Sequence, residues 1–353
     1  MDLLKYGIGI DMAMDSFDVC LSVIDLRQQV VIPSRGSFSN DKTGFDRFDA
    51  WCSKNKKHFL PAVYVMEATG VYYEQLAWHL HAKGYEICVV LPNKAKKYKE
   101  SLGLKSKTDR IDARGLAQMA CEQGLSRWQP LSVNIYRMRL VTRQIQSLSE
   151  QATALSNQLH ALQHGMFRDK DIEKILQKQL VLLKKSVTAL KLKVQTIINA
   201  DPLLKQKFDN IGKIKGLGYQ SLAVIVAETN GFAAFQSAGQ LVSYAGYDVV
   251  ANDSGKRAGK TKISKKGNSR IRRSLHFPVF NMIRYEVGVF KDLYQRVYDR
   301  SKLKMKAYTA VQKKLLIIIY ALWKNNEAFM DKVPGSLSLC GKKAQEPSPL
   351  LAG

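Results

Sequence analysis

The chain has 353 residues and carries 55 lysines and arginines against 30 aspartates and glutamates, a formal net charge of +25. Its length predicts two or three domains, and a hydrophobic fraction of 46% argues against a disordered chain. So large an excess of positive charge favours nucleic acid as the partner, with a membrane surface as the weaker alternative.

Apolar runs and cysteines exclude further classes of protein. The longest strongly apolar run, residues 315–323, is about half as long as the roughly 20 residues that cross a bilayer. The first ten residues lack the apolar core of a signal peptide. The five cysteines never form a CxxC pair, which argues against a zinc ribbon or a disulfide framework. We therefore expect a cytoplasmic protein that does not enter a membrane.

Residues 1–128 are predicted to alternate between strands and helices. The strands are expected at residues 6–11, 17–24, 29–32, 62–66 and 86–91, and the helices at residues 45–51, 73–82 and 108–121. Three consecutive strands followed by alternating helices and strands indicate a mixed sheet flanked by helices. This order is that of ribonuclease-H-like domains, so we predict an α/β domain here.

Residues 129–204 carry apolar residues that recur every seven positions, with a polar interruption at residues 168–171. The first run is Val141, Leu148, Leu155 and Leu162, interleaved with Ile145, Ala152, Leu159 and Met166. The second run is Leu176, Leu183, Leu190 and Ile197, interleaved with Leu180, Val187 and Val194. Heptads of this length predict two long coiled-coil helices, paired with each other or with a second subunit.

Residues 205–331 are predicted to form a third, mainly helical unit, followed by a disordered tail at residues 332–353 that is rich in serine, proline and lysine. Near its start, Gly216 and Gly218 precede an apolar helix expected at residues 219–227. A glycine-rich turn of this kind can present backbone N–H groups to a phosphate of nucleic acid. The bland alternative is that these glycines only cap helices.

A strongly basic segment follows at residues 254–273, without one acidic residue. Its cations are Lys256, Arg257, Lys260, Lys262, Lys265, Lys266, Arg270, Arg272 and Arg273. A run of one sign is commonly a solvated surface or tail. Because apolar segments flank this run and three glycines interrupt it, we predict an ordered loop that binds phosphates.

Four carboxylates occupy the ends of predicted elements in the first domain. Asp11 ends the first strand, Glu67 follows the strand at residues 62–66, and Asp109 and Asp112 share one face of a helix. Each taken singly has an ordinary interpretation, such as a cap or a partner for a nearby arginine. Gathered at one sheet edge, they would repel each other unless cations neutralised them, and hard oxygen ligands select Mg²⁺ or Mn²⁺. Two such ions about 3.5–4 Å apart would stabilise both oxygens of a phosphoryl displacement.

Three segments around these carboxylates resemble the acidic motifs of the DEDD transposases of bacterial insertion sequences, whose first domain is similar to the Holliday-junction resolvase RuvC. They are Ile8-Gly-Ile-Asp11, Met66-Glu-Ala-Thr-Gly70 and Lys107-Thr-Asp-Arg-Ile-Asp-Ala113. Further segments resemble the second domain of that family. They are Ile214-Lys-Gly-Leu-Gly218, Ser243-Tyr-Ala-Gly246, Asp253-Ser-Gly255 and Ile263-Ser-Lys-Lys-Gly-Asn268 with Arg272-Arg273. The resemblance extends over about residues 5–325.

The resemblance implies a DNA recombinase that moves its own insertion sequence. The four carboxylates would hold Mg²⁺, and Ser254 would act as a nucleophile that forms a phosphoserine link to DNA. Where many members have two serines before the glycine, this chain has Asp253 and Ser254, and Ser264 and Ser269 are weaker candidates. The resemblance also implies donor and target DNA, an element-encoded bridge RNA, a homo-oligomer (dimer or tetramer) and a place at the bacterial nucleoid.

Three other functions compete with this interpretation. A RuvC-like, structure-specific endonuclease would hydrolyse DNA with the acidic site alone and would not need Ser254. A non-catalytic nucleic-acid-binding scaffold would depend on the coiled coil, and its carboxylates would serve no reaction. An actin-like kinase also begins with an Ile-Asp strand, but it needs a second phosphate loop that the sequence does not show.

Overall fold

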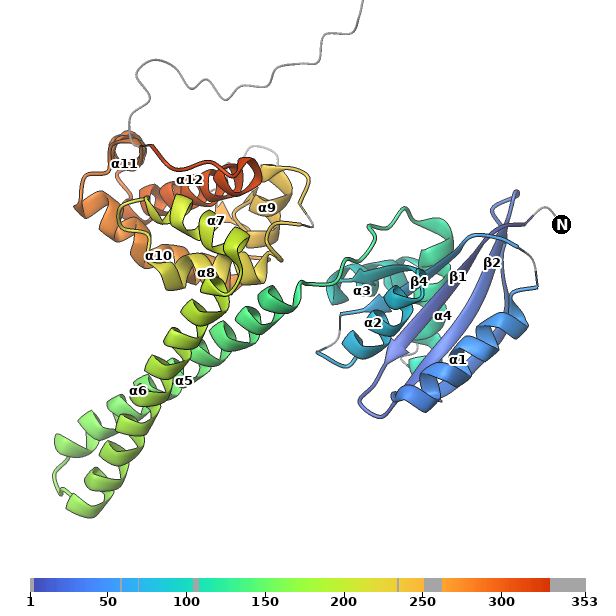
Figure 1. Ribbon diagram of the computed structural model, residues 1–353, viewed down its shortest axis with the longest axis horizontal. Coiled ribbons are helices and arrows are strands. Elements are labelled where there is room, and N and C mark those ends of the chain that lie inside the picture. The colour runs from blue at the N-terminus through green and yellow to red at the C-terminus, as the bar shows by residue number, and fades with distance from the viewer. Residues whose placement is uncertain are drawn as a thin grey trace, which may run out of the picture. The chain divides into compact units, whose positions relative to one another are not determined.

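The computed structural model describes residues 3–57, 59–68, 70–103, 108–233, 235–250 and 262–330. The chain forms two compact units, Met1–Pro130 and Leu131–Gly353, which are described separately (Figure 1). Some of the predicted functional residues lie outside the described residues, as does the predicted tail at residues 332–353. They are Ser254, Lys256, Arg257 and Lys260.

The first unit is built on a five-stranded sheet with the order β3-β2-β1-β4-β5. The strands are β1 (Leu3–Met12), β2 (Ser16–Asp25), β3 (Val30–Ser39), β4 (Ala62–Glu67) and β5 (Glu86–Val90). The first three strands pair antiparallel, whereas β4 runs parallel to both β1 and β5. This mixed sheet confirms the predicted α/β fold class.

Helices cover both faces of this sheet. They are α1 (Lys42–Asn55), α2 (Glu74–Ala82), α3 (Pro92–Ser101) and α4 (Asp109–Glu122). Apolar side chains of α1 and α2 pack on one face of the sheet, and those of α3 and α4 pack on the other. The helix α3 was not predicted from the sequence, because its residues are mostly polar and only Ala95 among them is buried.

The strand β1 alternates large and small residues, and this alternation fixes the position of α4. Ile8 and Ile10 are fully buried in the core beneath α1 and α2. Successive side chains of a strand point to opposite faces, so Gly7 and Gly9 face α4. A β-carbon on Gly9 would lie only 2.1 Å from the backbone nitrogen of Ala117. The glycines therefore allow α4 to pack directly on the backbone of β1.

The second unit begins with two long helices, α5 (Val133–Gln163) and α6 (Lys170–Asn199). They pack against each other within the chain as an antiparallel pair (Figure 1). The first predicted heptad run extends too far, because Met166 lies in the turn between the two helices and is 92% exposed. The neighbouring Gly165 falls just after the end of α5.

The rest of the second unit is a helical domain around one apolar core, as predicted. Its elements are α7 (Pro202–Gly212), α8 (Tyr219–Glu228), α9 (Ala238–Ala245), β6 (Val249–Val250), β7 (Lys262–Ile263), α10 (Ser269–Arg284), α11 (Gly288–Ser301) and α12 (Lys304–Asn325). Leu222, Leu275 and Leu315, from three of the helices, are buried in that core. Among the described residues, no helix is long and apolar enough to span a membrane.

Candidate active site

Two neighbouring parallel strands place Asp11 and Glu67 side by side. The register pairs Ile10 of β1 with Met66 of β4, and each carboxylate is the next residue of its strand. Because Ile10 and Met66 are buried beneath α1 and α2, the residue that follows each of them faces α3 and α4. Both carboxylates therefore lie at the same edge and on the same face of the sheet.

The start of α4 brings two more carboxylates to this edge. The Thr108 hydroxyl caps the helix by accepting a hydrogen bond from the backbone N–H of Ile111, at 3.3 Å. Asp109 and Asp112 occupy the first turn, directly before Ala113, the first of the residues that contact Gly9. Because α4 lies along β1, its first turn lies beyond Gly9, next to the end of the strand that carries Asp11. Asp112 is half-buried there and Asp109 is exposed.

The pKa of Asp11 reflects both its burial and the nearby carboxylates. Its pKa is raised from 3.8 to about 7, first because the carboxyl is buried and then because of the negative charges of Asp112 and Asp109. Glu67 adds a smaller effect in the same direction, whereas the positive charge of Lys99 lowers the pKa. Asp11 thus lies within electrostatic range of the other three carboxylates.

Lys99, on α3, is a fifth charged residue of the cluster, which the sequence analysis did not identify. Its Nζ lies 2.7 Å from Oδ1 of Asp112 and 3.6 Å from Oε2 of Glu67. The three side chains are only 13–18% exposed. Nothing in the local sequence distinguishes Lys99 from the other lysines of α3, because its role depends on where the helix packs.

The cluster has the chemistry of a divalent-cation site. Its donors are carboxylate oxygens from β1, β4 and α4, the ligand type that Mg²⁺ and Mn²⁺ prefer. The pKa of Asp11 is raised first by burial and then by the neighbouring carboxylates, and a divalent cation bound there would favour the charged carboxylate. The donor set therefore fits such an ion.

A tighter group of potential ligands lies on the opposite face of the sheet. In the part of the chain that the structure describes, three such side chains bring ligand atoms within 4.8 Å of one another only at Asp46, Asp49 and His79. Asp49 already contacts Nε2 of His79 at 2.7 Å and forms an ion pair with Lys83. Asp49 is thus already paired with His79 and Lys83, and none of the three residues belongs to a predicted acidic motif.

In the second unit, two predicted nucleic-acid-binding residues line one cleft. Arg270 and Arg273 of α10 line a cleft of about 220 Å³ together with Gln220 and Ser221 in the first turn of α8. The cap of α8, Gly218, provides no side-chain hydrogen bond. Backbone N–H groups at a helix start attract anions, and the start of α8 lies beside these two arginines.

Other predicted contact residues have structural roles. A β-carbon on Gly216, whose φ is +93°, would lie 3.2 Å from the backbone nitrogen of Met282, so this glycine lets the turn approach α10. Arg272 donates from Nη1 to the carbonyl oxygen of Ala245 at 2.7 Å. By contrast, Lys262, Lys265 and Lys266 are exposed. Among the predicted basic residues, Arg272 is thus packed against the protein, whereas these three lysines are accessible.

The two weaker nucleophile candidates differ in access. The Ser264 hydroxyl oxygen has no solvent contact, whereas Ser269, at the start of α10, is exposed. The segment that contains Ser254 connects β6 to β7, and the pairing of Val250 with Lys262 brings its two ends together.

A buried carboxylate, also missed by the sequence analysis, supports the basic region. The Glu228 side chain is 2% exposed and accepts hydrogen bonds from Nε and Nη2 of Arg143 at 2.7 and 3.0 Å. It also accepts from Nδ2 of Asn268 at 2.8 Å, the residue that caps α10. Burial raises the pKa of Glu228, but the hydrogen bonds from Arg143 and Asn268 outweigh burial, and the net pKa is lowered.

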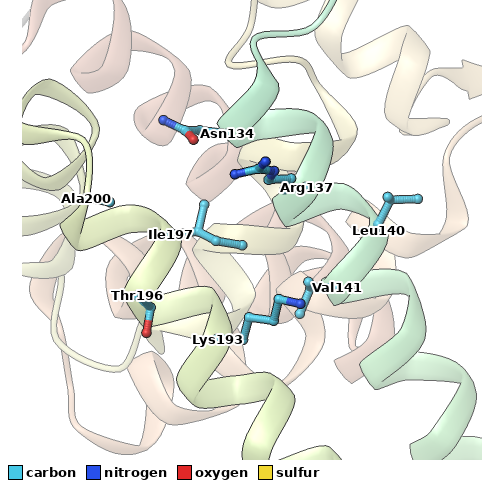
Figure 2. A pocket seen from close by; sticks show the side chains of 8 residues that line it. All are labelled: Asn134, Arg137, Leu140, Val141, Lys193, Thr196, Ile197 and Ala200. Atoms are coloured by element: carbon cyan, nitrogen blue, oxygen red, sulfur yellow. The ribbon is translucent and has the colours of Figure 1, made fainter.

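This unit also contains a groove along its two long helices. The groove lies between α5 and α6 (Figure 2), and its volume is about 550 Å³. Its lining residues are Asn134, Arg137, Leu140, Val141, Lys193, Thr196, Ile197 and Ala200 (Figure 2). The lining lacks carboxylates, and none of the predicted site residues belongs to it.

Comparison with known families identifies two matching regions. Residues 8–168 match the family model of DEDD transposases from IS110 elements, described as a transposase. Residues 209–295 match a second model, described as the transposase IS116/IS110/IS902 family. The two matches follow each other in the order of the two structural units and include the acidic cluster and the basic region.

Curated relatives and solved structures add further likenesses. The pilin gene-inverting proteins of Moraxella bovis and Moraxella lacunata are each 26% identical over 332 residues, which cover 93% of this chain and 99% of theirs. RuvC of Thermus thermophilus covers 35% of this chain and 99% of its own, with 13% identity and a TM-score of 0.28. The same resolvase in complex with a Holliday junction covers 32% of this chain and 90% of its own, with 15% identity and a TM-score of 0.24.

Proposed function

The chain belongs to the IS110/IS116/IS902 family of DEDD transposases, enzymes that cleave and rejoin DNA, and from this membership we propose that it recombines DNA with two groups of residues. The first is the acidic cluster of Asp11, Glu67, Asp109 and Asp112 in unit 1. The second is Ser254 in unit 2, together with the basic residues around it in the sequence. The observation that carries the proposal is the convergence of the four carboxylates at one sheet edge.

The four carboxylates are proposed to hold Mg²⁺ or Mn²⁺. A bound divalent ion neutralises charge that develops on the oxygens of a phosphoryl group during its transfer. The protein contributes the placement of the ligands, because β1, β4 and α4 hold Asp11, Glu67 and Asp112 at one edge. Because the pKa of Asp11 is raised, binding of a divalent cation would be coupled to loss of the proton from this carboxyl.

Ser254 is proposed to attack a DNA phosphorus atom. A bond forms between Oγ and phosphorus, the hydroxyl proton leaves to a base, and the bond to a deoxyribose oxygen breaks, with a proton taken up by that oxygen. A hydroxyl end of a second strand then reverses the step, which releases Ser254 and joins the new strands. A serine needs activation by a base or a metal for such an attack. The pairing of Val250 with Lys262 supports the proposal, because it anchors both ends of the segment that contains Ser254.

The accessible cations of unit 2 are proposed to hold nucleic-acid backbones. Lys262, Lys265 and Lys266 are exposed, and Arg270 and Arg273 line the cleft beside the start of α8. Donor and target DNA would lie on these groups. A bridge RNA would select the sequence by base pairing, so that the protein needs to bind only phosphates and duplex shape.

A homo-oligomer, a dimer or a tetramer, is part of the proposal. Several apolar side chains of α6 remain exposed in the single chain, and this exposure supports an oligomer. They include Val181, Leu182 and Leu192. Its DNA substrates would place the assembly at the nucleoid of the bacterial cytoplasm.

The test is a covalent-trapping assay. The protein would be incubated with Mg²⁺, DNA that spans the ends and target of its element, and RNA transcribed from the flanks of the element. We expect a protein–DNA adduct on denaturing electrophoresis that both Ser254→Ala and Asp11→Ala abolish. Ser264→Ala is the matched control and retains the adduct, because this hydroxyl has no solvent contact. Cleavage by Ser254→Ala without any adduct would show a hydrolytic nuclease instead.

Inversion of a DNA segment is a second candidate outcome. The relatives from both Moraxella species, which cover 93% of this chain, are named for the inversion of a pilin gene. A plasmid with two target sites in inverted orientation separates the two outcomes. Inversion exchanges the flanks of the intervening segment, whereas transposition moves the element to a new site.

A further inference from the structure

The contacts of Lys99 carry an inference about how the acidic cluster takes up its metal, and it rests on the proposed function of that cluster. The ammonium group lies 2.7 Å from Oδ1 of Asp112 and 3.6 Å from Oε2 of Glu67. These oxygens belong to two of the four proposed metal ligands and come from different elements, α4 and β4. Lys99 thus places a positive charge between two ligands that a divalent cation would also use.

A lysine and a divalent cation cannot share these oxygens without cost. Two positive charges a few ångströms apart repel each other strongly where solvent is largely excluded, and all three side chains are at most 18% exposed. The ammonium also occupies a lone pair of Asp112 Oδ1 through its hydrogen bond. Lysine has a flexible stem with a compact charge at its end, so its side chain can leave the cluster by rotation of its own bonds.

We propose that Lys99 competes with the divalent cation for Glu67 and Asp112, so that the metal binds tightly only after the ammonium has left the cluster. The phosphate of a DNA strand that enters the site is the natural new partner for this ammonium, because it offers the opposite charge at the same place. Lys99 is therefore a positioning residue that couples metal uptake to the arrival of the substrate. The protein alone holds its metal weakly, and the complex with DNA holds it more tightly.

Direct measurement of Mn²⁺ affinity tests the proposal without an activity assay. Free Mn²⁺ would be followed by electron paramagnetic resonance during titration of the full-length chain. We expect Lys99→Gln to bind Mn²⁺ about ten-fold more tightly than wild type, because the competing charge is gone. Lys96→Gln is the matched control on the same helix. Its Nζ is 3.8 Å from Glu100 on the surface, and the substitution leaves the affinity unchanged.

Further variants make the outcome decisive. Lys99→Arg keeps the charge and is expected not to gain affinity for Mn²⁺. Lys99→Met removes the charge but keeps an apolar stem. It is used in place of Lys99→Gln if the glutamine variant unfolds. Equal or weaker Mn²⁺ binding by the two uncharged variants would overturn the proposal and show that Lys99 supports the ligands.

Asp11→Asn separates this result from a failure of the proposed function. Mn²⁺ binding that Asp11→Asn abolishes, with equal affinity in wild type and Lys99→Gln, refutes only the role of Lys99. If neither protein binds Mn²⁺ in a manner that depends on Asp11, the metal site itself is wrong. A further measurement adds a DNA duplex with a non-cleavable backbone, which is expected to tighten Mn²⁺ binding by wild type but not by Lys99→Gln.

Discussion

Gly9 and Ala113 are in direct backbone contact across the sheet and its covering helix. A β-carbon on Gly9 would lie 2.2 Å from the carbonyl oxygen of Ala113, closer than any side chain permits. Asp112 immediately precedes Ala113 in α4, and Asp11 lies two residues after Gly9 in β1. The contact between the two backbones therefore sets the separation of two carboxylates of the acidic cluster.

We expect Gly9→Ala to damage both stability and the acidic site. The new methyl group pushes α4 away from β1, at a cost of about 3 kcal/mol in the free energy of unfolding. Mn²⁺ binding falls with it, because Asp112 moves with the helix. Chemical denaturation and Mn²⁺ titration measure the two effects. Gly124→Ala is the control, since a β-carbon there meets nothing within 4 Å. Equal stability of the two variants would contradict the importance of this contact.

The stability of unit 1 is expected to depend on pH through Asp11. Its pKa is about 7 in the folded chain against 3.8 for the ordinary group, so the folded state binds more protons between these values. The contribution of Asp11 to stability is therefore greatest at low pH and is lost as the pH rises from about 4 to 7. In the presence of a chelator, Asp11→Asn should be more stable than wild type at pH 8 by about 2 kcal/mol, after allowance for solvent screening. The two proteins should be equally stable at pH 4, and parallel pH profiles would disprove this effect.

Glu228 should matter more for stability than an exposed carboxylate on α5. Glu228→Gln removes the buried charge that accepts two hydrogen bonds from Arg143, which we expect to cost about 2 kcal/mol. Since the pKa of Glu228 is lowered, its stabilisation is present above the ordinary pKa and is lost as the pH falls through the lowered value. Glu150→Gln, which removes the surface partner of Arg273, should barely change thermal unfolding. Similar losses in both variants would argue against the buried network.

Arg272 and Lys266 should behave differently although both belong to the basic segment. Arg272→Gln removes the hydrogen bond to Ala245 and should lower stability by about 2 kcal/mol. Lys266→Gln leaves stability unchanged but removes an accessible cation. The slope of log affinity for nucleic acid against log salt concentration should then fall by about 1. A reversed pattern would mean that Arg272 contacts phosphates and Lys266 does not.

Much of unit 1 could be predicted from the sequence because its pattern is strong. The short apolar run at residues 6–11 predicted β1, and the apolar strand before Glu67 predicted β4. Carboxylates at the ends of these two predicted strands suggested a common sheet edge, and the structure adds that the strands are parallel. The third strand was predicted too short, since β3 continues to Ser39 through residues that alternate between the two faces without a strong apolar pattern.

The parts that the sequence did not predict depend on tertiary packing. The helix α3 has one buried residue, Ala95, and a helix with so little apolar surface leaves no periodic signal. Its Lys99 looks like any other lysine until the helix is placed against α4. Likewise, Glu228 ends an apolar helix, and its partner Arg143 lies 85 positions away in the chain. Ion pairs between distant positions leave no local pattern.

The alternation along β1 has one more consequence. The residues that anchor the core, Ile8 and Ile10, lie on one face of the strand, and the residues that build the acidic cluster lie on the other. Substitutions such as Ile8→Val change the melting temperature through lost packing, yet they leave the backbone contact that spaces the carboxylates intact. Thermal stability and the geometry of the acidic cluster are thus set on opposite sides of a single strand, and each can vary while the other is kept.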